Sequence, residues 1–222
     1  MPRNTFKGGQ RKIRKKRAKT TDGRQNQRLA KLESLILPSI EYKSRDVLAP
    51  PSSISTGGYA NQPMFQVEQG TQADQRIGDK VTLMSHNVCM SVASNDSTNV
   101  MRVIWLYTPS TTALSITDVL EYGNYTTHGD LVFSSPYKKK APNAENTYRV
   151  LFDKVYNIRS NQRLQTDKFQ LIPNKNGRQV QFQSVGSVMP ENYQLQVLAI
   201  SDSTTSPHPA LSYVCRSRFI DL

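Results

Sequence analysis

Over much of the chain after residue 80, apolar and polar positions alternate in short segments, which is typical of half-buried β-strands. In residues 80–93 the apolar positions follow one phase up to Leu83 and the opposite phase from Val88 onward. A change of phase within one run predicts a β-bulge, which we place near His86. Residues 99–108, NVMRVIWLYT, are almost continuously apolar, as expected of a strand that is covered on both faces.

Further strands are predicted by the same alternation, and turn residues such as those of PNKNG separate them; the segments are 148–158, 169–172, 179–185, 193–201 and 210–220. One segment differs. SITDVLEYG, residues 115–123, predicts a short helix that Ser115 or Thr117 caps and Gly123 ends. Seven or eight strands with one helix between them indicate an all-β protein, and we expect an eight-stranded antiparallel jelly-roll sandwich.

The first third of the chain has a different character. Leu29, Leu32 and Ile36 recur at helical spacing before Pro38, which predicts a short amphipathic helix. This helix could cover the edge of its own domain or meet its counterpart in a neighbouring subunit. Residues 45–63 are rich in Pro, Gly and Ser without periodicity, as in a linker. The predicted organisation is a basic N-terminal arm (1–31), a short helix with a linker (32–63) and a shell domain (64–222).

Positive charge is concentrated in that arm, where RKIRKKRAK places seven cations in residues 11–19. Residues 1–31 contain twelve cations and a single acid, Asp22, whereas residues 32–222 contain 17 cations and 16 acids. The candidate nucleic-acid-binding residues are therefore Arg3, Lys7, Arg11, Lys12, Arg14, Lys15, Lys16, Arg17, Lys19, Arg24, Arg28 and Lys31. The chain thus consists of a cationic arm and a nearly neutral body.

The basic arm has too few apolar residues to form a core, and its charges repel one another, so we expect it to be largely disordered or partly helical without a polyanion. High cation density is sufficient for binding phosphates through counterion release. Reading of bases needs rigid polar groups or interleaved aromatics, and the arm has only Phe6. It should bind nucleic acid without sequence preference, and it could also serve as a nuclear localisation signal.

No combination of residues in the sequence indicates catalysis. The three histidines, His86, His128 and His208, lack metal-ligand spacing, and the sequence contains no nucleophile elbow, P-loop, dinucleotide fingerprint or Cys-x-x-Cys pair. We therefore expect no enzyme and no cofactor, while Ca²⁺ at subunit contacts stays an open, unassigned alternative. Cys89 and Cys215 are expected to be buried free thiols.

Two further features bear on partners. Lys138, Lys139 and Lys140 form a second basic cluster, either a solvated loop or a contact with nucleic acid or another polyanion. No apolar run approaches the length of a membrane span, so we expect no membrane contact, and no apolar segment follows the N-terminal charges as in a secretory signal.

Several motifs resemble one family. QGTQADQRIGDKVTLMSHNV at 69–88, MRVIWLY at 101–107, ITDVLEY at 116–122 and YRVLFDKVYNI at 148–158 are similar to capsid proteins of the satellite tobacco necrosis virus type and of circular single-stranded DNA viruses that encode a replication protein. The Gln-Arg-x-Gly-Asp-x-Val entry into the first long strand is the most specific part. The similarity is good over about 68–160, whereas beyond 160 only the strand pattern agrees.

The resemblance implies a jelly-roll subunit that assembles into a small icosahedral shell, with the basic arm directed at a packaged single-stranded genome of DNA or RNA. The expected assembly is a T=1 homo-oligomer of sixty copies, located in the virion and, during assembly, also in the host nucleus. The alternative is a ribosomal or chromatin-type nucleic-acid-binding protein with a basic tail. Such a protein should also carry cations on its folded body, and the nearly neutral composition of residues 32–222 argues against it.

Overall fold

The computed structural model describes residues 25–26, 28–29, 31–32, 42–61, 64–94, 98–109, 111–139, 148–159, 163–184 and 186–221. The chain divides into two units, Met1–Glu41 and Tyr42–Leu222. In the first unit, the described residues are helical and exposed: Gln25, Asn26, Arg28, Leu29, Lys31 and Leu32. These positions confirm the helix prediction there, and the rest of that predicted helix, including Ile36 and Pro38, lies outside the described residues.

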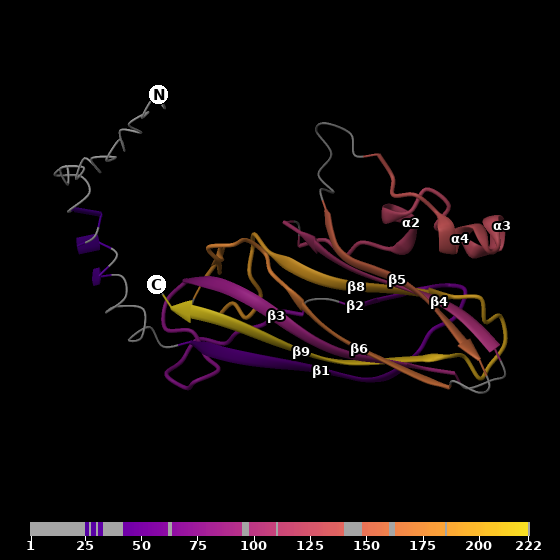
Figure 1. Cartoon of the computed structure of the whole chain (residues 1–222), viewed down its shortest axis with the longest axis horizontal. Helices are drawn as coiled ribbons and strands as arrows, with labels where there is room; N and C mark the ends of the chain where they lie inside the picture. The colour runs from indigo at the N-terminus through magenta and orange to yellow at the C-terminus, as the bar shows by residue number, and fades with distance from the viewer. Residues whose placement is uncertain are drawn as a thin grey trace, which may run out of the picture. The chain divides into compact units, whose positions relative to one another are not determined.

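The second unit is a sandwich of two antiparallel sheets (Figure 1). Sheet A has the order β1-β9-β3-β6, with β7 also paired to β3, and consists of β1 (Lys43–Ser53), β9 (Ala210–Asp221), β3 (Lys80–Ala93), β6 (Leu164–Leu171) and β7 (Arg178–Gln181). Sheet B has the order β2-β8-β4-β5 and consists of β2 (Tyr59–Asn61), β8 (Gln194–Ser201), β4 (Thr98–Thr108) and β5 (Arg149–Arg159).

The nine described strands occupy eight positions. β6 pairs with residues 86–93 of β3 and β7 with residues 80–83, so the two strands share one place in sheet A. Every pairing between these strands is antiparallel, and the chain passes repeatedly from one sheet to the other. This strand order confirms the predicted all-β fold, an antiparallel jelly-roll sandwich.

The prediction of a linker over residues 45–63 is wrong. These residues contain most of β1 and all of β2, so the folded unit begins at Tyr42 and not near residue 64. Pro50 and Pro51 suggested a linker because proline cannot donate a ladder hydrogen bond. However, among the described strands β1 lies at the edge of sheet A and pairs only with β9, and its register shifts between Ala49 and Ser52, where the prolines lie. Proline is tolerated at edges and bulges of this kind.

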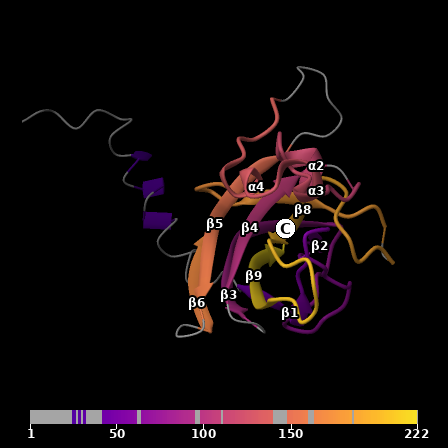
Figure 2. The same cartoon turned by 90° about the vertical axis from the view of Figure 1, so that its right-hand side faces the viewer.

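The predicted phase change in β3 is confirmed. The register between β3 and β9 shifts between Leu83 and Ser85, so residues on either side of the shift point to the same core. That main core lies between the sheets and includes Trp105, Tyr156 and Phe219, each with at most 1% of its surface exposed. Figure 2 shows the two layers that enclose it.

A second core forms on the outer face of sheet B. The segment between β4 and β5 contains three short helices, α2 (Ile116–Val119), α3 (Tyr125–His128) and α4 (Leu131–Ser134), and they lie over sheet B (Figure 1). Residues of β4 and β8 that point away from the main core pack against this insertion; the cluster contains Ile104, Leu106, Leu198, Ile200, Val119, Leu120 and Val132. This confirms the prediction that β4 is covered on both faces. In the described part of the chain, no such insertion covers the outer face of sheet A.

Candidate nucleic-acid interface

Of the twelve cations in the basic arm, Arg28 and Lys31 are described; both are helical and exposed. Their spacing of three residues places them on one side of the helix, whereas Leu29 and Leu32, about half exposed, share a neighbouring side. The other ten candidate binding residues lie outside the described residues, so their role stays a prediction.

The Gln-Arg-x-Gly-Asp motif has a structural explanation in the buried guanidinium of Arg76, which has no exposed surface. Its nitrogen atoms donate to the carbonyl oxygens of Gly78, Ser184 and Ser187 at 2.5, 2.9 and 2.8 Å, and to Oδ1 of Asp79 at 3.1 Å. Arg76 therefore joins the segment before β3 to the loop after β7. The motif is structural in this chain.

His86 is buried between the sheets and does not meet the other histidines. Its Nδ1 lies 2.7 Å from Oγ of Ser217 and its Nε2 lies 2.9 Å from the Tyr193 hydroxyl, so both ring nitrogens have partners. Burial lowers the pKa of His86 to about 3, which keeps the ring neutral near pH 7. Burial likewise raises the pKa of Tyr193 above its ordinary value. The pair forms a neutral hydrogen-bonded group within the core.

Of the other two histidines, His208 lies in the loop before β9, and His128 is the last residue of α3. The His208 ring contacts Oγ of Ser203 at 3.0 Å, and His128 packs edge-on against Tyr122. In the described part of the chain, no group of three or more His, Cys, Asp or Glu side chains could hold a metal ion. Within the same residues, no helix is long and apolar enough to span a membrane.

The two thiols are free but differ in exposure. Cys215 is buried, and burial raises its pKa to about 12. Cys89 is exposed, so the prediction that it is buried is wrong. The reason is the register shift in β3, after which Val88 and Met90 point into the core and Cys89 points out.

Lys138 and Lys139 are exposed at the end of the insertion over sheet B, whereas Lys140 lies outside the described residues. Lys138 is fixed through its main chain, because its N–H donates to the Val119 carbonyl oxygen at 2.9 Å. The same insertion is anchored by Arg102 of β4, which donates to both carboxylate oxygens of Asp153 on β5 at 3.0 and 2.6 Å. Arg102 also donates to the carbonyl oxygens of Val132 and Ser135, both at 2.9 Å.

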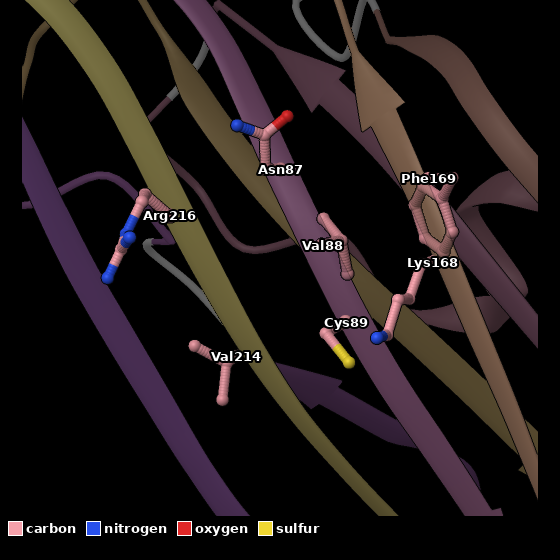
Figure 3. A pocket seen from close by; sticks show the side chains of 7 residues that line it. All are labelled: Asn87, Val88, Cys89, Lys168, Phe169, Val214 and Arg216. Carbon is pink, nitrogen blue, oxygen red and sulfur yellow. The ribbon is translucent and has the colours of Figure 1, made fainter.

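The outer face of sheet A is uncovered by other described elements and contains a shallow hollow of about 500 Å³. Figure 3 shows its lining, with Asn87 and Cys89 from β3, Val214 and Arg216 from β9, and Lys168 from β6. A second, open hollow of about 590 Å³ lies near the start of β5 and includes Arg149, Lys175 and Arg178 in its lining. Sequence periodicity did not single out either hollow, because each combines residues from strands or turns far apart in the chain.

The strand order defines a jelly-roll domain that follows a basic N-terminal segment. No family model and no curated protein sequence matches this chain. Among solved structures, a chain of Desmodium yellow mottle tymovirus aligns with a TM-score of 0.35 and 10% identity, covering 81% of this chain and 86% of that chain. A chain of infectious bursal disease virus, Gx strain, aligns with a TM-score of 0.19 and 8% identity, covering 82% of this chain and 41% of that chain. The jelly-roll assignment rests on the strand order and pairing of the chain itself.

Proposed function

We propose that this chain is a viral capsid protein. The jelly-roll domain builds a small icosahedral shell of sixty copies through lateral contacts, and the basic arm packages a single-stranded DNA or RNA genome. The observation that carries this proposal is the division of charge: twelve of the 29 Lys and Arg residues fall in residues 1–31, next to one acid, and precede a nearly neutral β-sandwich.

This division suits a container for nucleic acid. Cations that contact phosphates release condensed counterions, and the gain does not depend on base sequence. A nearly neutral body can associate with its copies without strong mutual repulsion. Sixty arms would supply roughly 660 positive charges, which would offset a comparable number of phosphates. The resemblance of residues 68–160 to capsid proteins of small single-stranded DNA viruses and satellite viruses supports the same function.

The particle is the main proposed location of the protein. RKIRKKRAK at 11–19 could additionally direct the newly made chain into the host nucleus. Fusion of residues 1–31 to a reporter protein tests this role, and a reporter that stays evenly distributed between nucleus and cytoplasm would exclude it.

Deletion of residues 1–31 is the principal test. We expect the truncated chain to keep the β circular-dichroism spectrum and to lose co-purified nucleic acid, measured by the ratio of absorbance at 260 and 280 nm. A matched full-length variant with all twelve arm cations replaced by Gln separates charge from length and should lose nucleic acid equally. Packaging at the level of the unmodified protein by either variant would contradict the proposed role of the arm.

Two further measurements test the remaining parts of the proposal. Binding of a single-stranded oligonucleotide should weaken steeply with salt, with a slope of log K against log salt concentration of about −8 if all twelve cations contact phosphates. Electron microscopy of the purified full chain should show particles of uniform size. A flat salt response would exclude the electrostatic mechanism, and a monodisperse monomer in the presence of nucleic acid would exclude the shell.

A further inference from the structure

The outer face of sheet A presents its side chains in rows that cross four strands. One row runs from Leu48 on β1 through Val214 and Cys89 to Lys168 on β6. The adjacent row runs from Asp46 through Arg216 and Asn87 to Gln170. Successive rows on one face of a sheet lie about 7 Å apart, since side chains repeat every second residue. The described part of the chain places no helix or loop over this face, in contrast to sheet B (Figure 1).

Charge on this face is predominantly positive. Its outward-pointing residues include four cations, Lys80, Lys168, Arg216 and Arg218, all exposed. Among the described strands, Asp46 is the one outward-pointing carboxylate on this face, and it accepts two hydrogen bonds of 2.7 Å each from Arg216. Among the described residues, neither Lys168 nor Arg218 forms an ion pair with a carboxylate. The outer face of sheet A is therefore net basic, although the body as a whole is nearly neutral.

We propose that the outer face of sheet A is a second nucleic-acid-binding surface, which contacts the phosphate backbone of a single strand through Lys168 and Arg218, while Asp46 holds Arg216. This inference rests on the proposed packaging function and adds a folded surface to the basic arm. Complementarity of charge favours a polyanion as the occupant of an uncovered basic sheet.

The chemistry of the face favours backbone contact over base reading. Its hollow combines two cations with Asn87, small apolar side chains and Phe169, whose ring is partly buried and stacks on Phe152 (Figure 3). The outward-pointing residues in the two rows described above contain no aromatic ring on which a base could stack, and the exposed Tyr42 ring already lies 5.1 Å from the Arg218 guanidinium carbon. Ser91, Ser212 and Thr166 add hydroxyl groups in the next row, and hydroxyls are common phosphate donors. Binding at this face should therefore be independent of sequence, like binding by the arm.

The first test compares the full chain with the double variant K168Q/R218Q. Loss of two phosphate contacts should make the slope of log K against log salt concentration less steep by about 1.4, and should weaken binding of a 40-nucleotide oligo(dT) about tenfold at 0.15 M salt. The matched control is K138Q/K139Q, which removes the same charge from the insertion over sheet B; under this inference that cluster is a solvated loop, so slope and affinity should be unchanged.

A second variant changes affinity in the opposite direction, so that a folding defect cannot imitate the effect. D46N removes the carboxylate that neutralises Arg216 and should strengthen oligonucleotide binding about fourfold, the gain expected from one further phosphate contact. Its control is D130N, which removes one exposed negative charge from the insertion and should leave affinity unchanged.

The outcomes separate this inference from the proposed function. Steep salt dependence in the unmodified protein, with K168Q/R218Q and D46N both indistinguishable from it, would overturn the binding face and leave the role of the arm intact. An equal loss of affinity in K168Q/R218Q and K138Q/K139Q would also overturn the face, because it would show that nucleic acid does not prefer sheet A to the insertion. Absence of oligonucleotide binding by the unmodified full chain would overturn the proposed function itself.

Discussion

The guanidinium carbon of Arg76 lies 4.2 Å from the centroid of the Phe182 ring, and both side chains are buried. This stacking orients the guanidinium group, which donates to the main-chain carbonyl oxygens of Gly78, Ser184 and Ser187. One side chain thus joins the segment before β3 to the loop between β7 and β8. Both segments expose an apolar side chain, Ile77 in the first and Met189 in the second.

Replacement of Arg76 by Lys should destabilise the domain although it keeps the charge. A lysine ammonium cannot reproduce the planar fork that reaches Gly78, Ser184 and Ser187, and carbonyl groups would be left unsatisfied. We expect the free energy of unfolding to fall by about 2–4 kcal/mol in urea titration of the full chain. The exposed control R218K should change it by less than about 0.5 kcal/mol. Equal stability of R76K and the unmodified protein would contradict the structural role of the motif.

His86 should make stability depend on pH below neutrality. Its pKa is about 3 in the folded protein and near 6.5 in the unfolded chain, so the unfolded state binds more protons between these values. Stability should therefore decrease as pH falls from about 6.5 toward 3, by up to about 1.4 kcal/mol per pH unit. The H86Q variant, which cannot titrate there, should lack this component. Parallel plots of unfolding free energy against pH for the two proteins would contradict the assignment.

The two thiols should react with alkylating reagents at different stages. Cys89 is exposed and should react in the native chain, whereas Cys215 is buried with a raised pKa and should react only after unfolding. Mass spectrometry after iodoacetamide treatment should find one modified cysteine per native chain and two after denaturation in urea. The C89S variant should show none in the native state. Rapid native labelling of Cys215 would contradict the packing of β9.

Asp153 should hold the helical insertion on sheet B. Its carboxylate accepts both hydrogen bonds from Arg102 and a further one from the Tyr137 hydroxyl. Burial, followed by this contact with Asp153, raises the pKa of Tyr137 to about 12. D153N should lower the unfolding free energy by about 1–3 kcal/mol and speed tryptic cleavage after Lys138 or Lys139.

The control for this prediction is D74N, which breaks the more exposed Arg45–Asp74 pair and should cost less than about 1 kcal/mol. If D74N and D153N reduced stability equally and cleavage rates were unchanged, the insertion would not depend on the Arg102–Asp153 contact.

The strands of the body could be predicted because their information is local. A period of two residues marks a half-buried strand wherever it occurs, and a reversal of its phase in residues 80–93 gave the bulge as well. β1 could not be predicted in this way. Its two prolines are typical of a linker. They are compatible with a strand because β1 lies at the edge of sheet A, beside β9.

The structural role of Arg76 could not be predicted from the sequence either. The motif around it was recognisable, but two of its partners, Ser184 and Ser187, lie 108 and 111 residues further along the chain. The helices α3 and α4 gave no periodic signal because each has only four residues. The cations of the basic face of sheet A come from β3, β6 and β9, which lie far apart in the sequence. The net charge of residues 32–222 therefore did not indicate this face.

The position of β9 has a consequence for synthesis of the protein. β9 lies between β1 and β3 and is the partner of both, although it is the final strand of the domain. A ribosome-bound chain that lacks this strand therefore holds β1 without its neighbour and leaves a row of main-chain donors and acceptors on β3 unpaired. Completion of sheet A must await translation of the last strand, which delays native folding and gives incomplete chains open edges that can aggregate.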